Sequence, residues 1–121
     1  MSIFVVEDEP SLQYFYKQVL TLNNFKIAGI ARDGEEAVSL FKSLPEKPKV
    51  ILMDYRLPKK NGIIATQEIL RIDNSVKIIF TSADDSAKEE ALSLGACVFL
   101  DKPFTINQLI EEIKKAMGES N

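Results

Sequence analysis

The chain has 121 residues, 45% of them apolar, and carries a formal net charge of −3. This length suits one domain over residues 1–121 that buries a core without metal or disulfide staples, and the lack of a basic excess argues against direct nucleic-acid binding. Histidine is absent, which excludes Ser-His-Asp catalysis, histidine-based zinc sites and phosphotransfer from a histidine of this chain.

Two strand–helix pairs are predicted in the first part of the chain. The apolar run 3–6 predicts a strand, and it is too short for a signal sequence or a membrane span. Pro10 suits the first position of a helix, after which apolar residues recur at helical spacing. Residues 25–31 alternate more loosely and predict an edge strand. Asp33 followed by Glu36 is a capping pattern that opens a second helix.

The middle of the chain is dominated by one apolar run that stops at a carboxylate. Residues 50–53 are typical of a strand buried on both faces, and Asp54 ends it. Asn61 is placed to cap a third helix. The apolar face of this helix is expected to contain Ile64, Ile69 and Leu70. Residues 76–80 predict a fourth strand that leads into Thr81.

The last part predicts a short helix, a strand and a longer helix. Ser86 with Glu89 is a capping pattern for the short helix, which is the least apolar of the helices. Residues 97–100 predict the fifth strand. Thr105 with Gln108 caps the last helix. Its apolar face is expected to contain Ile106, Leu109, Ile110, Ile113 and Met117.

Five strand–helix units with short loops predict an α/β fold. Right-handed crossovers give a parallel sheet with helices on both faces, which is a three-layer sandwich. We adopt the strand order 2-1-3-4-5 of flavodoxin-like (βα)5 domains, in which the carboxyl ends of strands one, three, four and five are neighbours. These ends carry Glu7 and Asp8, Asp54, Thr81, and Lys102 respectively.

The polar residues at these strand ends indicate a particular chemistry. Two charges ~4 Å apart interact by about 4 kcal/mol at an effective dielectric of ~20, so three carboxylates together repel strongly. A hard divalent cation relieves this repulsion, and ligands that are all oxygen favour Mg²⁺, with Mn²⁺ as an alternative. A metal, the Lys102 ammonium, the Thr81 hydroxyl and one aspartate suit phosphoryl transfer to a carboxylate.

Each residue also has an ordinary structural interpretation. Asp54 would cap the loop that follows its strand. Glu7 and Asp8 would be a charge pair at a helix N-terminus, which the helix dipole favours. Thr81 would be a hydrogen-bonding residue at a strand end, and Lys102 a solvated loop lysine. The coincidence of these residue types at neighbouring strand ends favours the functional interpretation.

The sequence resembles the receiver domain of two-component response regulators, of the single-domain chemotaxis type, over residues 3 to about 117. Each matching motif is short, but their order along the chain and their positions at strand ends make the set specific. The motifs are VVEDE (5–9), MDYRLP (53–58), NG (61–62), FTSA (80–83), GA (95–96) and KPF (102–104).

The resemblance implies a role for each site residue. Asp54 is the phosphoacceptor, and Asp8, Asp54 and the backbone carbonyl of Arg56 bind Mg²⁺ directly. Glu7, where many members have aspartate, holds a metal-bound water. Lys102 contacts the phosphoryl oxygens. Receivers catalyse only their own phosphotransfer and dephosphorylation, so the chain is expected to be a signalling domain rather than an enzyme.

The resemblance also implies a switch. Thr81 turns its hydroxyl towards the phosphoryl group, and Phe99, at the aromatic switch position, rotates from exposed to buried. The peptide bond before Pro103 is expected to be cis. The surface of the fourth helix, fifth strand and fifth helix is expected to change and to control a downstream target or an output domain.

The expected phosphodonor is a sensor histidine kinase or a histidine phosphotransfer protein. The lone Cys97 fits a reducing cytoplasm, and no membrane association is expected. Regulators that dimerise through this output surface usually have an acidic residue after Gly-Ala. Here Cys97 follows, so we expect a monomer before phosphorylation. The sequence leaves open whether the receiver stands alone or was cut from a longer regulator.

Three other functions fit less well. A phosphatase of the haloacid dehalogenase type needs a second acid two residues after the nucleophile, where this chain has Arg56. A flavodoxin-like flavin carrier needs a phosphate-binding loop after the first strand, where residues 7–9 are all acidic. A pseudo-receiver that binds a partner without phosphate is hard to reconcile with the complete set of site residues.

Overall fold

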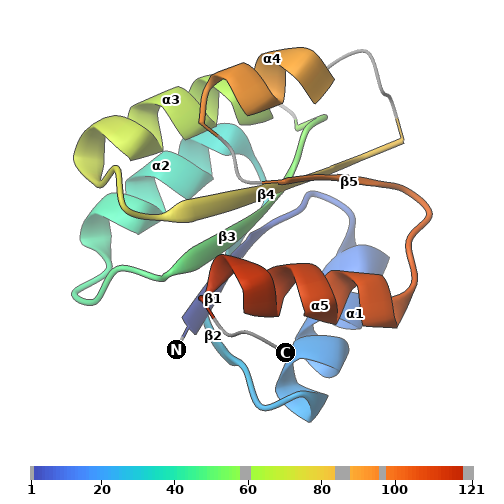
Figure 1. Ribbon diagram of the computed structural model, residues 1–121. Coiled ribbons are helices and arrows are strands. Elements are labelled where there is room, and N and C mark those ends of the chain that lie inside the picture. Colours follow the sequence, from blue (N-terminus) through green and yellow to red (C-terminus); the bar gives the residue numbers. More distant parts are fainter. Residues whose placement is uncertain (1, 58–60, 84–87, 96–97, 119–121) are drawn as a thin grey trace.

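The protein folds around one parallel sheet, shown in the computed structural model of Figure 1, which describes residues 2–57, 61–83, 88–95 and 98–118. The strand order is β2-β1-β3-β4-β5, which confirms the predicted order. All neighbouring strands are parallel. The strands are β1 (Ser2–Val6), β2 (Lys26–Ala31), β3 (Val50–Asp54), β4 (Lys77–Ser82) and β5 (Val98–Asp101).

Helices cover both faces of the sheet, so the predicted three-layer sandwich is confirmed. Figure 1 shows α2, α3 and α4 on one side of the sheet and α1 and α5 on the other. The helices are α1 (Pro10–Leu22), α2 (Gly34–Ser43), α3 (Gly62–Ile72), α4 (Lys88–Ser93) and α5 (Ile106–Ala116). In the described parts of the chain, none of them is long and apolar enough to span a bilayer.

Helix caps read from the sequence are present where the structure describes them. The Asp33 side chain accepts a hydrogen bond from the backbone N–H of Glu36 and so begins α2. Thr105 and Gln108 form a reciprocal capping box at the start of α5. These bonds satisfy amide groups that a helix leaves unpaired at its first turn. The Ser86 cap lies outside the described residues, as does Cys97.

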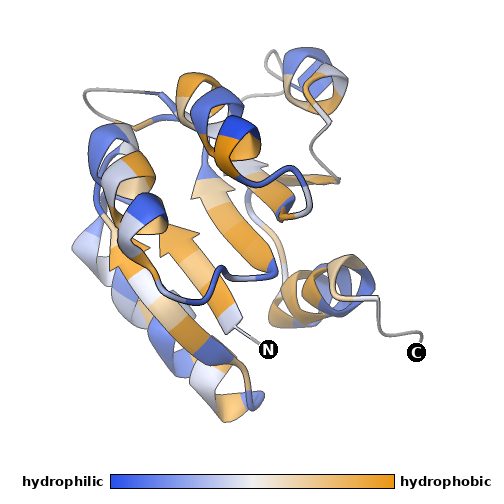
Figure 2. Cartoon of the chain, turned by 90° about the vertical axis from the view of Figure 1, so that its left-hand side faces the viewer, coloured by the Kyte–Doolittle hydropathy of each residue, from blue (hydrophilic) through white to orange (hydrophobic). Residues whose placement is uncertain are grey.

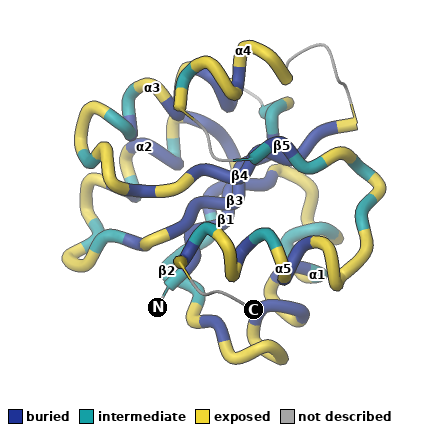
Figure 3. Tube along the Cα trace, viewed as in Figure 1, coloured by how far each residue is buried: buried dark blue, intermediate teal, exposed yellow. Residues whose placement is uncertain are grey.

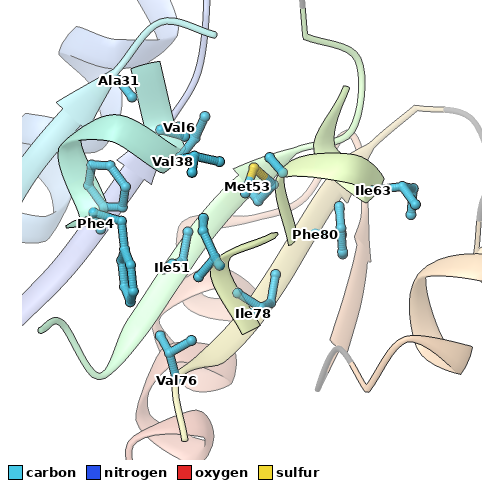
Figure 4. Close-up of a cluster of buried hydrophobic side chains, with 14 of the residues drawn as sticks. Phe4, Val6, Ala31, Val38, Ile51, Met53, Ile63, Val76, Ile78 and Phe80 are labelled. Atoms are coloured by element: carbon cyan, nitrogen blue, oxygen red, sulfur yellow. The ribbon is translucent and has the colours of Figure 1, made fainter. Parts of the chain in front are cut away.

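Two hydrophobic clusters lie on the two faces of the sheet, because successive side chains of a strand point to opposite faces. β3 is buried along its whole length, and Figure 3 shows the central strands buried while the outer sides of the helices are exposed. Figure 2 shows that these strands are largely hydrophobic. The cluster towards α2, α3 and α4 contains Phe4, Met53 and Phe80 (Figure 4). The cluster towards α1 and α5 contains Val5, Leu52 and Ile79.

Two predicted core positions are wrong. Ile64 is 44% exposed and Ile106 is 46% exposed. Ile106 is exposed although it has helical spacing to the buried Leu109 and Ile110. In α3 the close packing of Gly62 sets the rotation of the helix. A Cβ at Gly62 would lie 2.8 Å from the carbonyl oxygen of Asp54, so only a glycine lets α3 approach β3 so closely, and Ile63 then becomes buried instead of Ile64.

Candidate metal site at the carboxyl end of the sheet

Three polar side chains of the candidate site extend the rows of apolar residues that face α1 and α5. Glu7, Asp54 and Thr81 each follow, two positions later, a residue of the α1–α5 cluster. Those preceding residues are Val5, Leu52 and Ile79. Because side chains alternate along a strand, all three polar side chains project to the same face. Asp54 and Thr81 are also paired in the β3–β4 register.

An acidic cluster forms where β1 and β3 end. Carboxylate oxygens of Glu7, Asp8 and Asp54 lie within 4.8 Å of one another. Glu7 is 2% exposed and Asp54 is 7% exposed, whereas Asp8 faces solvent. A site made only of carboxylate oxygens, open on one side, fits a hard cation that keeps part of its water shell. The donor set therefore suits Mg²⁺ and could bind it.

Lys102 supplies a positive charge to this cluster. Its Nζ donates a hydrogen bond to Asp54 Oδ1 at 2.9 Å and lies 3.8 Å from Glu7 Oε1. The backbone N–H of Lys102 donates to the carbonyl of Ser82 at 2.9 Å, which fastens the residue to the end of β4. The Lys102–Pro103 peptide bond is cis, as predicted.

Burial perturbs both inward carboxylates. Desolvation raises the pKa of Asp54, and its hydrogen bond with Lys102 and the backbone N–H of Arg56 oppose the rise. Desolvation raises the pKa of Glu7 from 4.5 to about 7, with the Asp54 carboxylate adding to the rise and Lys102 opposing it. One lysine therefore does not compensate two buried carboxylates, and a divalent cation would stabilise their charged forms.

The start of α1 holds Glu7 in place. The backbone N–H of Glu9 donates to Glu7 Oε2 at 3.2 Å, and Gln13 Nε2 donates to the Glu7 carbonyl at 2.6 Å. Gln13 is a site residue that the sequence did not predict. A glutamine in the first turns of an amphipathic helix is ordinary, so the sequence carries no signal for this contact.

The predicted switch residues lie on different faces of the sheet. Thr81 is 1% exposed and belongs to the site, next to Asp54 in the register. Phe99 belongs to the opposite cluster, with Ala91 of α4. Phe99 is 7% exposed, so the expectation that its ring starts exposed is wrong for this structure. Arg56 is exposed and lies two residues after the end of β3, and the metal-binding role of its carbonyl stays a prediction.

The chain matches the family described as response regulator receiver domain over residues 3–114. It is 36% identical over 115 residues to the chemotaxis protein CheY of Thermotoga maritima, covering 93% of this chain and 94% of that protein.

Two solved structures share the fold. One is the receiver domain of the sensor histidine kinase PA1611 from Pseudomonas aeruginosa, with a magnesium ion coordinated in its active site cleft (30% identity, TM-score 0.86, 98% of each chain). The other is the response regulator TrrA of Thermotoga maritima in complex with Mg²⁺-BeF (29% identity, TM-score 0.85, 95% of this chain and 97% of that one).

Proposed function

The chain belongs to the response regulator receiver domain family, and we propose that it is a phosphorylation-activated signalling switch whose phosphoacceptor is Asp54. The observation that carries the proposal is the position of this carboxylate. Asp54 is buried at the end of the central strand, 2.9 Å from Lys102 and within the acidic cluster. In parallel α/β sheets, ligands bind at this edge.

The proposed reaction is direct transfer to Asp54. A carboxylate oxygen attacks the phosphorus of a phosphohistidine, the phosphorus–nitrogen bond breaks, and the imidazole nitrogen leaves with its electron pair and takes a proton from solvent. Asp8, Asp54 and the Arg56 carbonyl would hold Mg²⁺, with Glu7 contacting a metal-bound water. The metal would supply charge neutralisation to the transferring group. Lys102 would contact the phosphoryl oxygens.

The phosphodonor is proposed to be a sensor histidine kinase or a histidine phosphotransfer protein. The acyl phosphate would add about −1.5 to −2 charge and three acceptor oxygens at Asp54. Thr81 would turn its hydroxyl towards them, and the change would reach the surface of α4, β5 and α5 and control a downstream protein or an output domain. We also propose that residues 1–121 form one receiver domain, because both clusters pack on a single sheet. We propose that it is monomeric before phosphorylation, because Cys97 and not an acidic residue follows Gly-Ala.

Acetyl phosphate with Mg²⁺ tests the phosphoacceptor. The intact mass of the wild-type chain is expected to rise by one phosphoryl group, and removal of Mg²⁺ with a chelator should stop the reaction. Asp54→Asn should abolish the mass increase, because an amide is a poor nucleophile. Asp101→Asn, an exposed aspartate at the end of β5, is the matched control and should react normally. Phosphate recovered on a serine or threonine would refute the assignment.

A further inference from the structure

Tyr16 of α1 carries a buried hydroxyl for which the described residues provide no hydrogen-bond partner. The residue is 1% exposed. Among the described side chains, two other buried polar atoms share this property, Glu7 Oε1 and Thr66 Oγ1. Thr66 lies in α3, on the opposite side of the sheet (Figure 1). The remaining two atoms, Tyr16 Oη and Glu7 Oε1, both belong to the α1 side of the sheet.

The fold places Tyr16 and Glu7 on the same side of the sheet. Tyr16 packs in the α1–α5 cluster with Val5 of β1. Glu7 follows Val5 by two positions and projects to the same face of the sheet. Burial raises the pKa of the Tyr16 phenol above its ordinary value, and the Glu7 carboxylate raises it further. The nearby Thr81 hydroxyl opposes this rise, and the Asp54 carboxylate adds to it. The phenol therefore stays protonated and can donate. Its neighbour Glu7 can only accept when it is ionised.

A tyrosine at this position needs an explanation beyond packing. The ring fills the core, which a phenylalanine would also do. The additional hydroxyl costs free energy when it is buried without a partner. Glu7 Oε1 is also unsatisfied, with Lys102 Nζ 3.8 Å away as its nearest described cation. The structure therefore holds an unpaired donor and an unpaired acceptor on the same side of the sheet.

We propose that Tyr16 is a positioning residue of the candidate metal site, whose hydroxyl donates a hydrogen bond to Glu7 Oε1 and orients that carboxylate when a cation occupies the acidic cluster. The inference rests on the metal site of the proposed function. It adds a residue that does not bind the metal but orients one of the carboxylates. Groups that orient metal-binding carboxylates in this way commonly change metal affinity by one or two orders of magnitude when they are removed.

A purely structural role makes a different prediction. Tyr16 also lines a cavity of about 420 Å³ with Leu12, Phe15 and Lys102. If the hydroxyl only lined this cavity and made no contact with Glu7, its removal would leave Mg²⁺ affinity unchanged. The two roles therefore separate in one measurement, because Tyr16→Phe keeps the ring and removes only the hydroxyl.

The test is calorimetric titration of Mg²⁺ into the full chain and its variants, at a pH above the Glu7 pKa of about 7. Tyr16→Phe is expected to weaken Mg²⁺ binding about tenfold. The melting temperature of the metal-free variant should not fall, since the removed hydroxyl had no partner. Tyr14→Phe, which alters an exposed tyrosine of the same helix, should bind Mg²⁺ as the wild type does.

A double variant tests whether Tyr16 affects Mg²⁺ binding through Glu7. In a Glu7→Leu background the acceptor is absent, so adding Tyr16→Phe should change Mg²⁺ affinity by less than about twofold. Wild-type affinity in Tyr16→Phe, or an undiminished loss in the Glu7→Leu background, would overturn the role of Tyr16 and leave the proposed function standing. A wild-type chain that does not bind Mg²⁺ would overturn both.

Discussion

The two ends of the sheet handle charge in opposite ways. At the amino end, Lys26, Lys49 and Lys77 lie at or just before the starts of three strands, and all three are exposed. At the carboxyl end, Glu7 and Asp54 are almost completely buried beside one partly exposed lysine. Exposed lysines keep their hydration, whereas buried carboxylates lose theirs. Among the described residues of these two ends, the carboxyl end therefore holds buried charge at a cost to folding, whereas the amino-end lysines do not.

Removing a lysine from each end gives the largest expected contrast. Lys102→Met leaves two buried carboxylates without their cation and is expected to lower the free energy of unfolding by about 3 kcal/mol at neutral pH. Lys77→Met, at the amino end, should change it by less than about 0.5 kcal/mol. Urea denaturation of the metal-free variants measures both. Equal effects would mean that the buried carboxylates are not held by Lys102.

The pH dependence of stability sharpens the same contrast. Because the pKa of Glu7 rises from 4.5 in the unfolded chain to about 7 in the fold, the native state binds more protons than the unfolded state between these values. The metal-free chain should therefore lose about 3 kcal/mol of stability as the pH rises through this window. Thermal melts across the range test this.

Two controls belong to the pH experiment. Glu7→Gln should flatten the dependence, because the titrating group is gone. Saturating Mg²⁺ should stabilise the wild-type chain most at the upper end of the window, where both carboxylates are ionised and the site repels itself most. Stability that increases with pH between 4.5 and 7 would contradict the assignment of Glu7 as the dominant buried acid.

The smallest expected effect is communication from the carboxyl end to a distant surface. Adding Mg²⁺ and beryllofluoride, a phosphoryl mimic, should shift NMR signals of α4, β5 and α5, and much less so in Thr81→Ala. We expect a coupling of about 1 kcal/mol. The NMR signals of the amino-end lysines should not shift and so serve as the reference. Shifts confined to the neighbours of Asp54 in the wild type would mean that the site and this surface are not coupled.

The sequence predicted those features that depend on local pattern. The run that ends at Asp54, the cap at Asp33 and the capping box at Thr105 require only short segments, and each is present. Glu7 and Lys102 were placed correctly because strand ends of a parallel sheet meet at one edge. A known strand order was enough to bring them together.

Features that depend on how elements pack were not predictable in this way. The burial of Phe99 depends on the side of β5 against which α4 lies, and the exposure of Ile64 on the rotation that Gly62 allows. The helical spacing of apolar residues after Pro10 is consistent with the burial of the Tyr16 ring. Periodicity carries no information on where a hydroxyl at the edge of that ring will lie.

The close contact at Gly62 has a consequence for anyone who wishes to make this chain more robust. Glycine-to-alanine exchange in a helix is a routine stabilising step, worth about 0.4–1 kcal/mol where the site has room. Gly95 and Gly118 have positive φ, which rules them out, and the glycines within helices are Gly34 and Gly62. Yet a new methyl group at Gly62 would press on the carbonyl of Asp54. The apparent improvement would displace the residue on which signalling is proposed to depend.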